Sequence, residues 1–523
     1  MANSATSSSG ANPWLIAVVV SMATFMEVLD TSIANVSLRY IAGGLAAGLD
    51  ESTWVLTSYL VSNAIILPLS GWLAVRVGRK RFYMTCVALF VISSFLCGIA
   101  PSLMFLLTAR VFQGAGGGGL APSEQAILTD TFPASKRGSA FALYGIAVVV
   151  APAIGPTLGG WITDNYSWRW IFYINIPVGI LSLTLTHFLV PGDEKKSSDP
   201  RAKGSVDFLG FGLVALGLGC LQVVLDRGQI DDWFGSTLIT VFAIISAFCL
   251  ILLIIHELTT PSPVVDLPLM ADPKFFISCF CMFLFGAVLF STTQLLPQLS
   301  QELLGYTATL AGETLSPGAV VIILLLPLAG WLLKHVQPKY LIAFGFLSTS
   351  VALWIMSRIF TTTASFNWLT AARCMQAFGL AFVFVPINTV AYTGLPKGKS
   401  NQASALINLM RNLGGSVGIS VAQTMIDRRS QFHQNRLVGG ISDLNHNVWS
   451  AIHGWSARHT TVGPPDFSQM PRSLATLYKQ LGDQATMMSY LDVFHVMAIA
   501  ALASVAVIMF MRRIKLSEEE IVH

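Results

Sequence analysis

Residues 13–38 read PWLIAVVVSMATFMEVLDTSIANVSL, an apolar run that contains two acidic residues, Glu27 and Asp30. A helix needs about 20 apolar residues to cross a bilayer, so the run is long enough to span one. An acid at bilayer depth costs on the order of 3 kcal/mol and usually faces a cavity or a partner. The three-residue spacing puts both acids on one helix face, about 4.5 Å apart along the axis. The stretch predicts a membrane helix with a buried acidic face, unless one or both acids lie among the lipid headgroups.

The composition indicates an integral membrane protein. Of the 523 residues, 54% are hydrophobic and 11% are charged, whereas a soluble domain carries about 25% charged residues. The seven cysteines fall in apolar stretches without a CxxC pair, so we expect buried thiols and neither disulfides nor metal ligands. The polar N-terminus lacks a basic cluster and a cleavage site, so we expect the first apolar run to be retained as a helix.

Fourteen apolar windows follow one another, and no strand pattern competes with them. In lipid only helices and closed barrels satisfy the backbone, so each window predicts a transmembrane helix. The windows lie near residues 13–36, 53–73, 83–100, 103–124, 139–162, 169–190, 207–225, 236–256, 275–297, 308–333, 340–358, 367–392, 402–425 and 489–511. Basic residues follow the even-numbered windows, which makes that face cytoplasmic and places both termini there. The acidic loop at 257–274 is the exception.

An internal repeat relates the two ends of the chain. Residues 110–116, RVFQGAG, recur as residues 373–379, RCMQAFG, and residues 71–73 recur as residues 330–332. Parallel six-helix repeats are an arrangement of transporter halves around an axis along the membrane normal. We expect a cytoplasmic tail, a six-helix half, a linker with two extra helices, a second half and a second tail. Their boundaries are residues 1–12, 13–190, 191–274, 275–511 and 512–523, with a large periplasmic loop at 427–488.

Several short motifs carry a family resemblance. They are LDTSIANV at 29–36, GWLAVRVGRKR at 71–81, Arg110 with Gln113 and Gly114, GPTLGG at 155–160, WRWIFYINIPVG at 168–179, LPQLSQELLGYTAT at 296–309 and NLMRNLGGSVG at 408–418. In this order they resemble the major facilitator superfamily, and within it the fourteen-helix drug:proton antiporter branch, the EmrB/QacA subfamily. The resemblance implies an all-α membrane protein of the major facilitator fold, with two six-helix halves and an inserted hairpin. Val75 departs from it, because the loop motif has an acid there.

The resemblance implies a proton-driven multidrug efflux antiporter of the bacterial inner membrane, which exports hydrophobic or amphipathic compounds by alternating access and gives antibiotic resistance. It also implies a periplasmic membrane-fusion adaptor and an outer-membrane channel as partners. The alternatives are a proton-coupled uptake symporter of the same fold and a non-transporting membrane receptor or scaffold. The GPTLGG core favours the antiporter over the symporter, and charges at bilayer depth favour either carrier over the receptor. We expect no enzymatic activity, no cofactor beyond the coupling protons, no metal and no nucleic-acid partner.

Asp30, Arg110 and Glu27 are the predicted proton-coupling residues. Helix rise places Asp30 and Arg110 roughly 10 to 12 Å below the same membrane surface. A nearby cation favours the charged form of a carboxylate and burial disfavours it, so separating the pair would change proton affinity. The alternative for Arg110 is a structural role, in which it bonds helix carbonyls. Its repeat equivalent Arg373 has no acid partner in the ninth window and is expected to be structural.

The substrate is expected between the halves, near the bilayer midplane. An apolar and aromatic wall with few polar groups suits hydrophobic ligands, and few interior acids favour neutral or weakly acidic ones. The candidate cavity residues are Phe25, Met26, Tyr59, Asn63, Gln294, Gln298, Phe382, Phe384, Asn388 and Arg411. Arg411 has a second interpretation, as a residue of the cytoplasmic gate.

Conformational roles are predicted for glycines, a proline and one arginine. Pro156 lacks an N–H and kinks its helix, while small neighbours allow another helix to approach closely. The residues are Gly155, Pro156, Gly159, Gly160, Gly71 and Arg79. We expect the group at 155–160 to form a rocking contact between the halves, with a plain packing kink as the alternative. Glu313 either binds a proton or cation or is solvated at the outer end of the tenth window.

Overall fold

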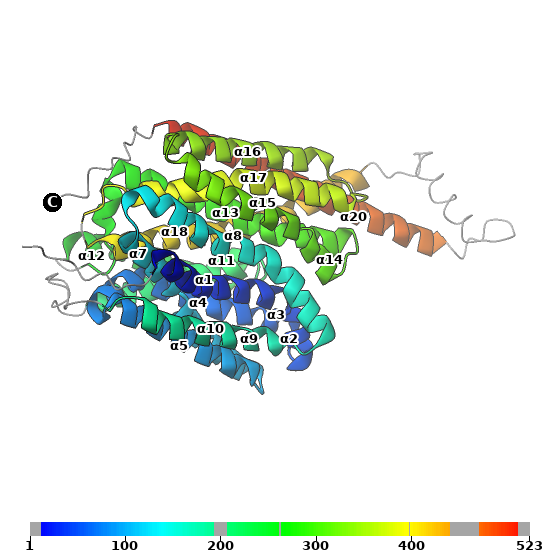
Figure 1. Ribbon diagram of the computed structural model, residues 1–523. Helices are drawn as coiled ribbons and strands as arrows, with labels where there is room; N and C mark the ends of the chain where they lie inside the picture. The colour runs from blue at the N-terminus through cyan, green and yellow to red at the C-terminus, as the bar shows by residue number, and fades with distance from the viewer. Residues whose placement is uncertain (1–11, 193–206, 261–262, 397, 440–469, 511–523) are drawn as a thin grey trace, which may run out of the picture.

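The computed structural model describes residues 12–192, 207–260, 263–396, 398–439 and 470–510. In these ranges every regular element is a helix, and the long helices run roughly parallel in one bundle (Figure 1). Nearly all of the two predicted tails, and residues 440–469 of the predicted loop at 427–488, lie outside the described residues. Many large apolar side chains are exposed on the bundle, including Phe188 (77%) and Leu324 (69%), as expected of a surface that faces lipid.

The first half of the chain contributes the helices that pack around α1. They are α1 (Pro13–Val36), α2 (Leu38–Gly44), α3 (Leu49–Ser52), α4 (Trp54–Val77), α5 (Arg79–Gly98), α6 (Leu103–Gly117), α7 (Leu120–Thr131), α8 (Ala134–Asn165), α9 (Trp170–Tyr173) and α10 (Asn175–Leu189). Asn12 caps α1 by accepting a hydrogen bond from the Trp14 N–H, and Pro13 follows at a position where its missing N–H is harmless. Because α1 packs against α7, α8 and α10, its acidic face is enclosed by protein.

The second half has a similar arrangement of helices. Its elements are η3 (Leu267–Ala271), α13 (Pro273–Leu303), α14 (Ala308–Glu313), α15 (Ser316–Leu332), α16 (Pro338–Ile359), α17 (Phe366–Ala391), α18 (Ser400–Val438) and α20 (Met470–Met509). The two halves meet where α8 packs against α14, α15 and α17, and where α18 packs against α4 and α7.

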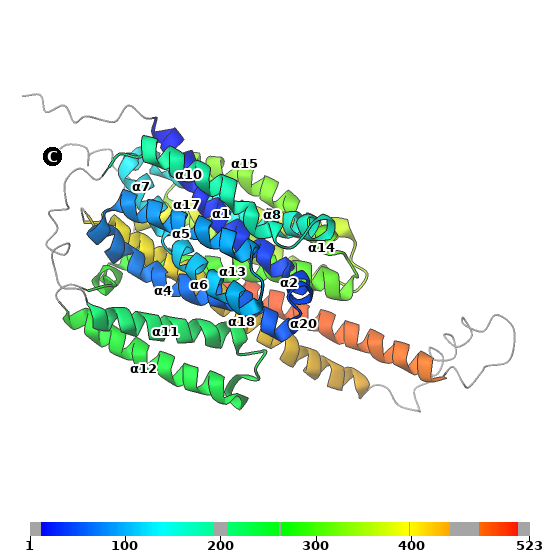
Figure 2. The ribbon, with the colours of Figure 1, turned by 90° about the horizontal axis from the view of Figure 1, so that it is seen from below.

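The inserted hairpin consists of α11 (Phe208–Arg227) and α12 (Thr237–Thr259), joined by a turn that contains η2 (Trp233–Gly235). It lies at the edge of the bundle beside α4 (Figure 2). Gln222 accepts a hydrogen bond from Ser416 of α18 at 3.1 Å, so the hairpin also touches the second half. α12 has the highest mean hydropathy of the candidate spans, 3.1, and is only 22% buried, which fits a helix that faces lipid.

Twelve helices of the described ranges are long and apolar enough to cross a membrane. The fourth and thirteenth predicted spans are not among them, each for a physical reason. The fourth is broken at Gly118 and Gly119 into α6 and α7, because a run of glycines has low helix propensity. The thirteenth, α18, is rich in amide and charged side chains but packs against α4, α7, α13 and α20, so it needs no continuous apolar surface.

The helices α18 and α20 extend well past one end of the bundle (Figures 1 and 2). They contain 39 and 40 residues. Helices of that length measure roughly 60 Å, about twice the thickness of the hydrocarbon core. Polar contacts join the extended parts, including an ion pair of 2.6 Å between Arg429 and Asp492. Much of the described sequence between 427 and 488 therefore forms helix continuous with two transmembrane spans.

Candidate functional site

A buried ion pair joins α1 to α6. Arg110 Nη1 lies 2.6 Å from Asp30 Oδ2, and the two residues are 0% and 2% exposed. Their meeting agrees with the equal depths expected from helix rise. Removing two charges from water costs several kcal/mol per ion, and the attraction compensates only if the remaining polar atoms are also satisfied.

Neighbouring side chains complete the coordination of the carboxylate. Asn175 Nδ2 donates to Asp30 Oδ1 at 2.7 Å, and Gln113 Nε2 donates to the same oxygen at 3.0 Å. Arg110 also donates from Nε to the Val55 carbonyl at 3.0 Å, and its guanidinium lies 4.4 Å from the centre of the Tyr59 ring. A cation and two amides thus hold the Asp30 side chain, while the structural bond expected for Arg110 is present as well.

The second half contains the same arginine geometry without the acid. Arg373 Nη1 donates to Gln376 Oε1 at 2.8 Å, as Arg110 Nη1 does to Gln113 Oε1 at 2.8 Å. In place of a carboxylate, Arg373 meets the hydroxyls of Thr292 and Thr293 at 3.2 and 3.1 Å. Arg373 is 1% exposed, so the described contacts leave this buried cation with neutral partners.

Two further carboxyl groups lie in the interior of the first half. Glu27 is 8% exposed, and its Oε1 accepts a hydrogen bond of 3.0 Å from Asn63 Nδ2. Glu124 of α7 is 0% exposed, and neither of its carboxyl oxygens has a hydrogen-bond partner. Glu124 is enclosed by protein because α1, α5 and α18 all pack against α7.

A polar network crosses from the first half to the second. Gln125 Oε1 accepts hydrogen bonds from Asn408 at 2.7 Å and from the Tyr392 hydroxyl at 2.9 Å. Farther along, Tyr144 receives a hydrogen bond of 3.1 Å from Arg411. Asn388 and Arg411 were predicted from the sequence, whereas Gln125, Tyr144 and Asn175 were not. All residues from 120 to 129 are buried, so α7 is enclosed by its neighbours. This burial results from the packing of other helices and could not be read from the sequence.

The predicted cavity residues divide into two groups. Those at the interface between the halves include Phe384, which stacks on Tyr144 at 5.8 Å, and Asn388, which accepts a 3.3 Å hydrogen bond from Gln125. Asn63 also belongs to this group, since its side chain accepts a hydrogen bond of 3.4 Å from Asn412 of α18. Tyr59 lies under the Arg110 guanidinium, beside this group.

The remaining candidates lie elsewhere. Phe382 packs against Phe344 of α16 at 5.5 Å, within the second half. Met26 is 1% exposed and faces Gly179 of α10, and Phe25 packs in a separate apolar cluster. Gln298 donates to Glu302 on its own helix at 3.1 Å, and Gln294 is half-buried. The structure therefore does not gather all ten predicted residues in one place.

The glycines of α8 lie in contact with two different helices. A Cβ at Gly155 would lie 2.4 Å from Ser32 Oγ, and one at Gly159 would lie 2.9 Å from Ile33 Cγ2, both on α1. Gly160 instead faces Thr309 of α14, where a Cβ would lie 3.1 Å from the backbone nitrogen. The segment that begins at Gly155 and Pro156 therefore packs against α1 inside the first half and against α14 of the second half.

More contacts close this end of the bundle. A Cβ at Gly312 of α14 would lie 2.4 Å from the backbone nitrogen of Thr157, and the Thr157 and Ser316 hydroxyls are 3.3 Å apart. The Tyr40 hydroxyl donates to Asp164, and this hydrogen bond raises the pKa of Tyr40. Glu313, at the same end, is exposed.

The opposite end, which we call the basic end, is closed by α4, α5, α7 and α18. A Cβ at Gly71 would lie 3.0 Å from the Gln402 Cα, so this glycine permits close packing of α4 on α18. Arg79 forms an ion pair with Asp130, and Asp130 also accepts a 3.5 Å hydrogen bond from Ser400. Because both ends are in contact, the region between the halves is enclosed on both sides.

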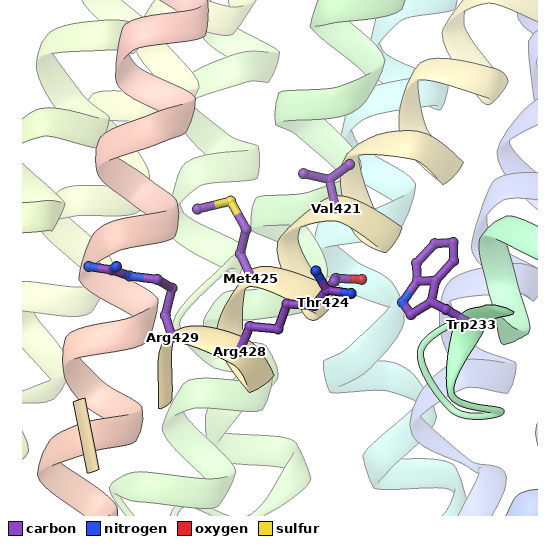
Figure 3. Close-up of a pocket in the computed structure, with 6 residues that line it drawn as sticks. All are labelled: Trp233, Val421, Thr424, Met425, Arg428 and Arg429. Carbon is purple, nitrogen blue, oxygen red and sulfur yellow. The ribbon is translucent and has the colours of Figure 1, made fainter. Parts of the chain in front are cut away.

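A pocket of about 320 Å³ lies away from Asp30, between α18 and the turn of the inserted hairpin (Figure 3). It is lined by Trp233, Val421, Thr424, Met425, Arg428 and Arg429. Figure 3 shows Trp233 facing the α18 residues across this pocket. Because it is remote from the buried ion pair, we do not assign it to the same site.

The described residues contain no group of three or more His, Cys, Asp or Glu side chains placed to hold a metal ion. Their chemistry is that of buried carboxyl groups, arginines and amides inside a membrane bundle. Buried carboxyl groups bind and release protons, and their proton affinity changes when their arginine and amide partners move.

Comparisons with known proteins agree with this geometry. The family model described as Major Facilitator Superfamily matches residues 20–419. The multidrug export protein EmrB of Escherichia coli strain K12 is 38% identical over 448 residues, which cover 85% of this chain and 87% of that protein. The fatty acid resistance protein FarB of Neisseria gonorrhoeae is 36% identical, with 86% of each chain covered. Among solved structures, the proton:xylose symporter XylE aligns with a TM-score of 0.60 at 15% identity, covering 94% of both chains.

Proposed function

The chain belongs to the major facilitator superfamily, and on that premise we propose that it is a proton-driven antiporter that exports lipophilic compounds. The observation that carries the proposal is the ion pair between Asp30 and Arg110, which is sealed from water and held by two amides. A multi-pass carrier that couples to protons needs a carboxyl group whose proton affinity depends on conformation.

The coupling follows from the contacts of Asp30. With the carboxylate ionised, Arg110 and Gln113 of α6 and Asn175 of α10 are drawn onto α1. Protonation removes the charge that Arg110 neutralises and weakens both amide hydrogen bonds, so the attachment of α1 to these helices loosens. Each protonation state therefore favours a different packing of the first half, and substrate binding between the halves selects between them.

The chemistry between the halves supports an amphipathic substrate. Phe384 stacks on Tyr144 and also contacts Phe285, so the three rings form an aromatic cluster at this interface. Arg411 lies beside them and donates to Tyr144. Aromatic surface with one cation suits lipophiles that are neutral or weakly acidic, and the name of the relative FarB refers to fatty acids.

We further infer that the carrier lies in the bacterial inner membrane with both termini in the cytoplasm. The basic end would then be the cytoplasmic end, in accordance with the positive-inside rule. The extended helices α18 and α20 would project into the periplasm, where they offer a surface for a membrane-fusion adaptor and, through it, an outer-membrane channel. The relative EmrB is named a multidrug export protein, which supports export as the direction of transport.

The experiment uses purified protein in liposomes with an imposed pH gradient and a lipophilic fluorescent substrate. An antiporter moves the substrate against the direction of proton flow, so a gradient imposed in either sense drives it into the compartment with more protons. An uptake symporter of this fold moves both in the same direction. Transport along with the protons would replace the antiporter by the symporter, and no gradient-driven transport of any lipophilic probe would contradict both.

A further inference from the structure

Four polar residues follow one another along α1 at three-residue intervals. They are Ser21, Thr24, Glu27 and Asp30, and their exposed fractions are 7%, 0%, 8% and 2%. Neighbours at this spacing lie about 4.5 Å apart along the helix axis, and the whole row spans about 13.5 Å. The row begins at the Asp30–Arg110 ion pair and ends toward the basic end of the bundle.

Glu124 of α7 lies beside the far end of this row. The hydroxyls of Ser21 and Thr24 and the carboxyl group of Glu27 all act on its carboxyl group. Several atoms of this cluster lack a hydrogen-bond partner among the described residues: both Glu124 oxygens, Ser21 Oγ, Thr24 Oγ1 and Glu27 Oε2. Native proteins leave few buried polar atoms unsatisfied, so a cluster of them is a departure that needs an explanation.

The groups around Glu124 do not neutralise it as an anion. The charged and titratable neighbours are Glu27, Arg411, Tyr83 and Tyr144. Arg411 donates instead to Tyr144 and to Asn412, and no cation of the described residues pairs with Glu124. A buried carboxylate that is not paired with a cation is strongly disfavoured, so burial favours the protonated form of this group.

We propose that Glu124 is the proton-release group of the basic end, supplied from Asp30 through Glu27 and the hydroxyls of Thr24 and Ser21. A hydroxyl both accepts and donates, so each one takes a proton on one side and gives up its own on the other. One proton thereby leaves Asp30, which returns to its ion pair with Arg110, and one proton arrives at Glu124. In the described residues Asp30 is paired with Arg110 and no cation pairs with Glu124, which is the arrangement expected after this transfer.

Release follows when the basic end opens. Glu124 lies about 10 Å from the end of α7, and α18 covers that helix. Movement of α18 away from α7 would expose the carboxyl group, which would then pass its proton to water and become an anion. This inference rests on the proposed antiport, because it describes the path of the same coupled proton.

The test compares Glu124→Gln and Thr24→Val with the wild type in liposomes, by substrate-evoked proton movement. Both variants are close in shape to the native residues, and Ser123→Ala is the matched control, since it removes a buried unpartnered hydroxyl from α7 beside the row. We expect proton movement to fall by a factor on the order of ten or more in Glu124→Gln and Thr24→Val and to remain normal in Ser123→Ala. Wild-type rates in Glu124→Gln or in Thr24→Val would overturn the proposed path and leave antiport intact, whereas no proton movement in the wild type would remove the antiporter itself.

Infrared difference spectra provide a readout that does not depend on transport. In the wild type, opening the basic end with substrate should remove a protonated-carboxyl band, and Glu124→Gln should lack this band. If Glu124→Gln shows the same band loss as the wild type, the proton was not on Glu124.

Discussion

At the scale of single residues, the two arginines of the repeat differ in one respect, which is the presence of an acidic partner. Arg110 and Arg373 make the same 2.8 Å hydrogen bond to a glutamine one turn ahead, but only Arg110 has a carboxylate partner. The two halves therefore contain the same arginine–glutamine pair, once with a titratable carboxylate partner and once without one.

Replacing Asn175 by Leu should change the pH dependence of transport. The variant loses the 2.7 Å hydrogen bond to Asp30, which favours the ionised form. Such a bond contributes about 1.5 to 3 kcal/mol, so its loss should move the pH dependence of transport toward higher pH. The measurement is the pH midpoint of substrate-driven proton exchange. Thr292→Val, which removes a hydroxyl partner of Arg373, is the control and should leave the midpoint in place. An acid shift or no shift in Asn175→Leu would contradict the assignment.

Replacing Arg373 by Met should weaken the fold but not the coupling. The variant removes a buried cation whose partners are two threonines and a glutamine, and these lose their hydrogen bonds. The cost should be a few kcal/mol at most, because burial of the cation is itself unfavourable. We expect a lower melting temperature in detergent with substrate-evoked proton movement retained, and Arg110→Met should lose that movement. Equal loss in both variants would assign coupling to both halves.

The residues of the site were only partly predictable from the sequence. Helix rise along two windows brought Asp30 and Arg110 to one depth, and they form an ion pair. Their role in coupling stays a prediction. Asn175 and Glu124 could not be found this way, because their positions depend on how α10 and α7 pack around α1.

At the scale of helices, the order and class of the elements were predictable, and the all-helical major facilitator fold is confirmed. Apolar windows of about 20 residues are strong signals because lipid requires a fully bonded backbone. The break between α6 and α7 was not predicted, and neither were the polar composition and the great length of α18. Both depend on neighbours that cover these helices, which no window of sequence contains.

A disulfide between α8 and α15 should stop transport reversibly. The hydroxyls of Thr157 and Ser316 are 3.3 Å apart across the end of the bundle that is opposite the basic end. Cysteines at both positions can therefore form a bond that prevents these helices from separating. We expect oxidant to abolish substrate transport in the double variant and reductant to restore it, while each single variant stays active in oxidant. Full activity with a complete cross-link would show that this end need not open.

At the scale of the whole molecule, the two halves touch at both ends and enclose the polar network between them. A carrier in this arrangement admits no solvent from either side. Substrate can then be exchanged only if one end opens while the other stays closed, as alternating access requires.

The orientation in the membrane can be tested with single cysteines at exposed positions. Lys334 follows α15 at the basic end, and Ser365 precedes α17 at the other end. In intact cells, a membrane-impermeant thiol reagent should label Ser365→Cys but not Lys334→Cys, and cell lysis should make both reactive. The wild type, whose cysteines are buried or half-buried, sets the background. The reverse pattern would invert the proposed topology.

The most direct measurement follows protons released from the purified protein when substrate is added in weakly buffered detergent solution with a pH indicator. The account predicts that the wild type releases protons, because substrate and proton compete through Asp30. It predicts that Asp30→Asn binds the substrate but releases none. Equal release from Asp30→Asn would contradict the central claim that this carboxyl group carries the coupled proton.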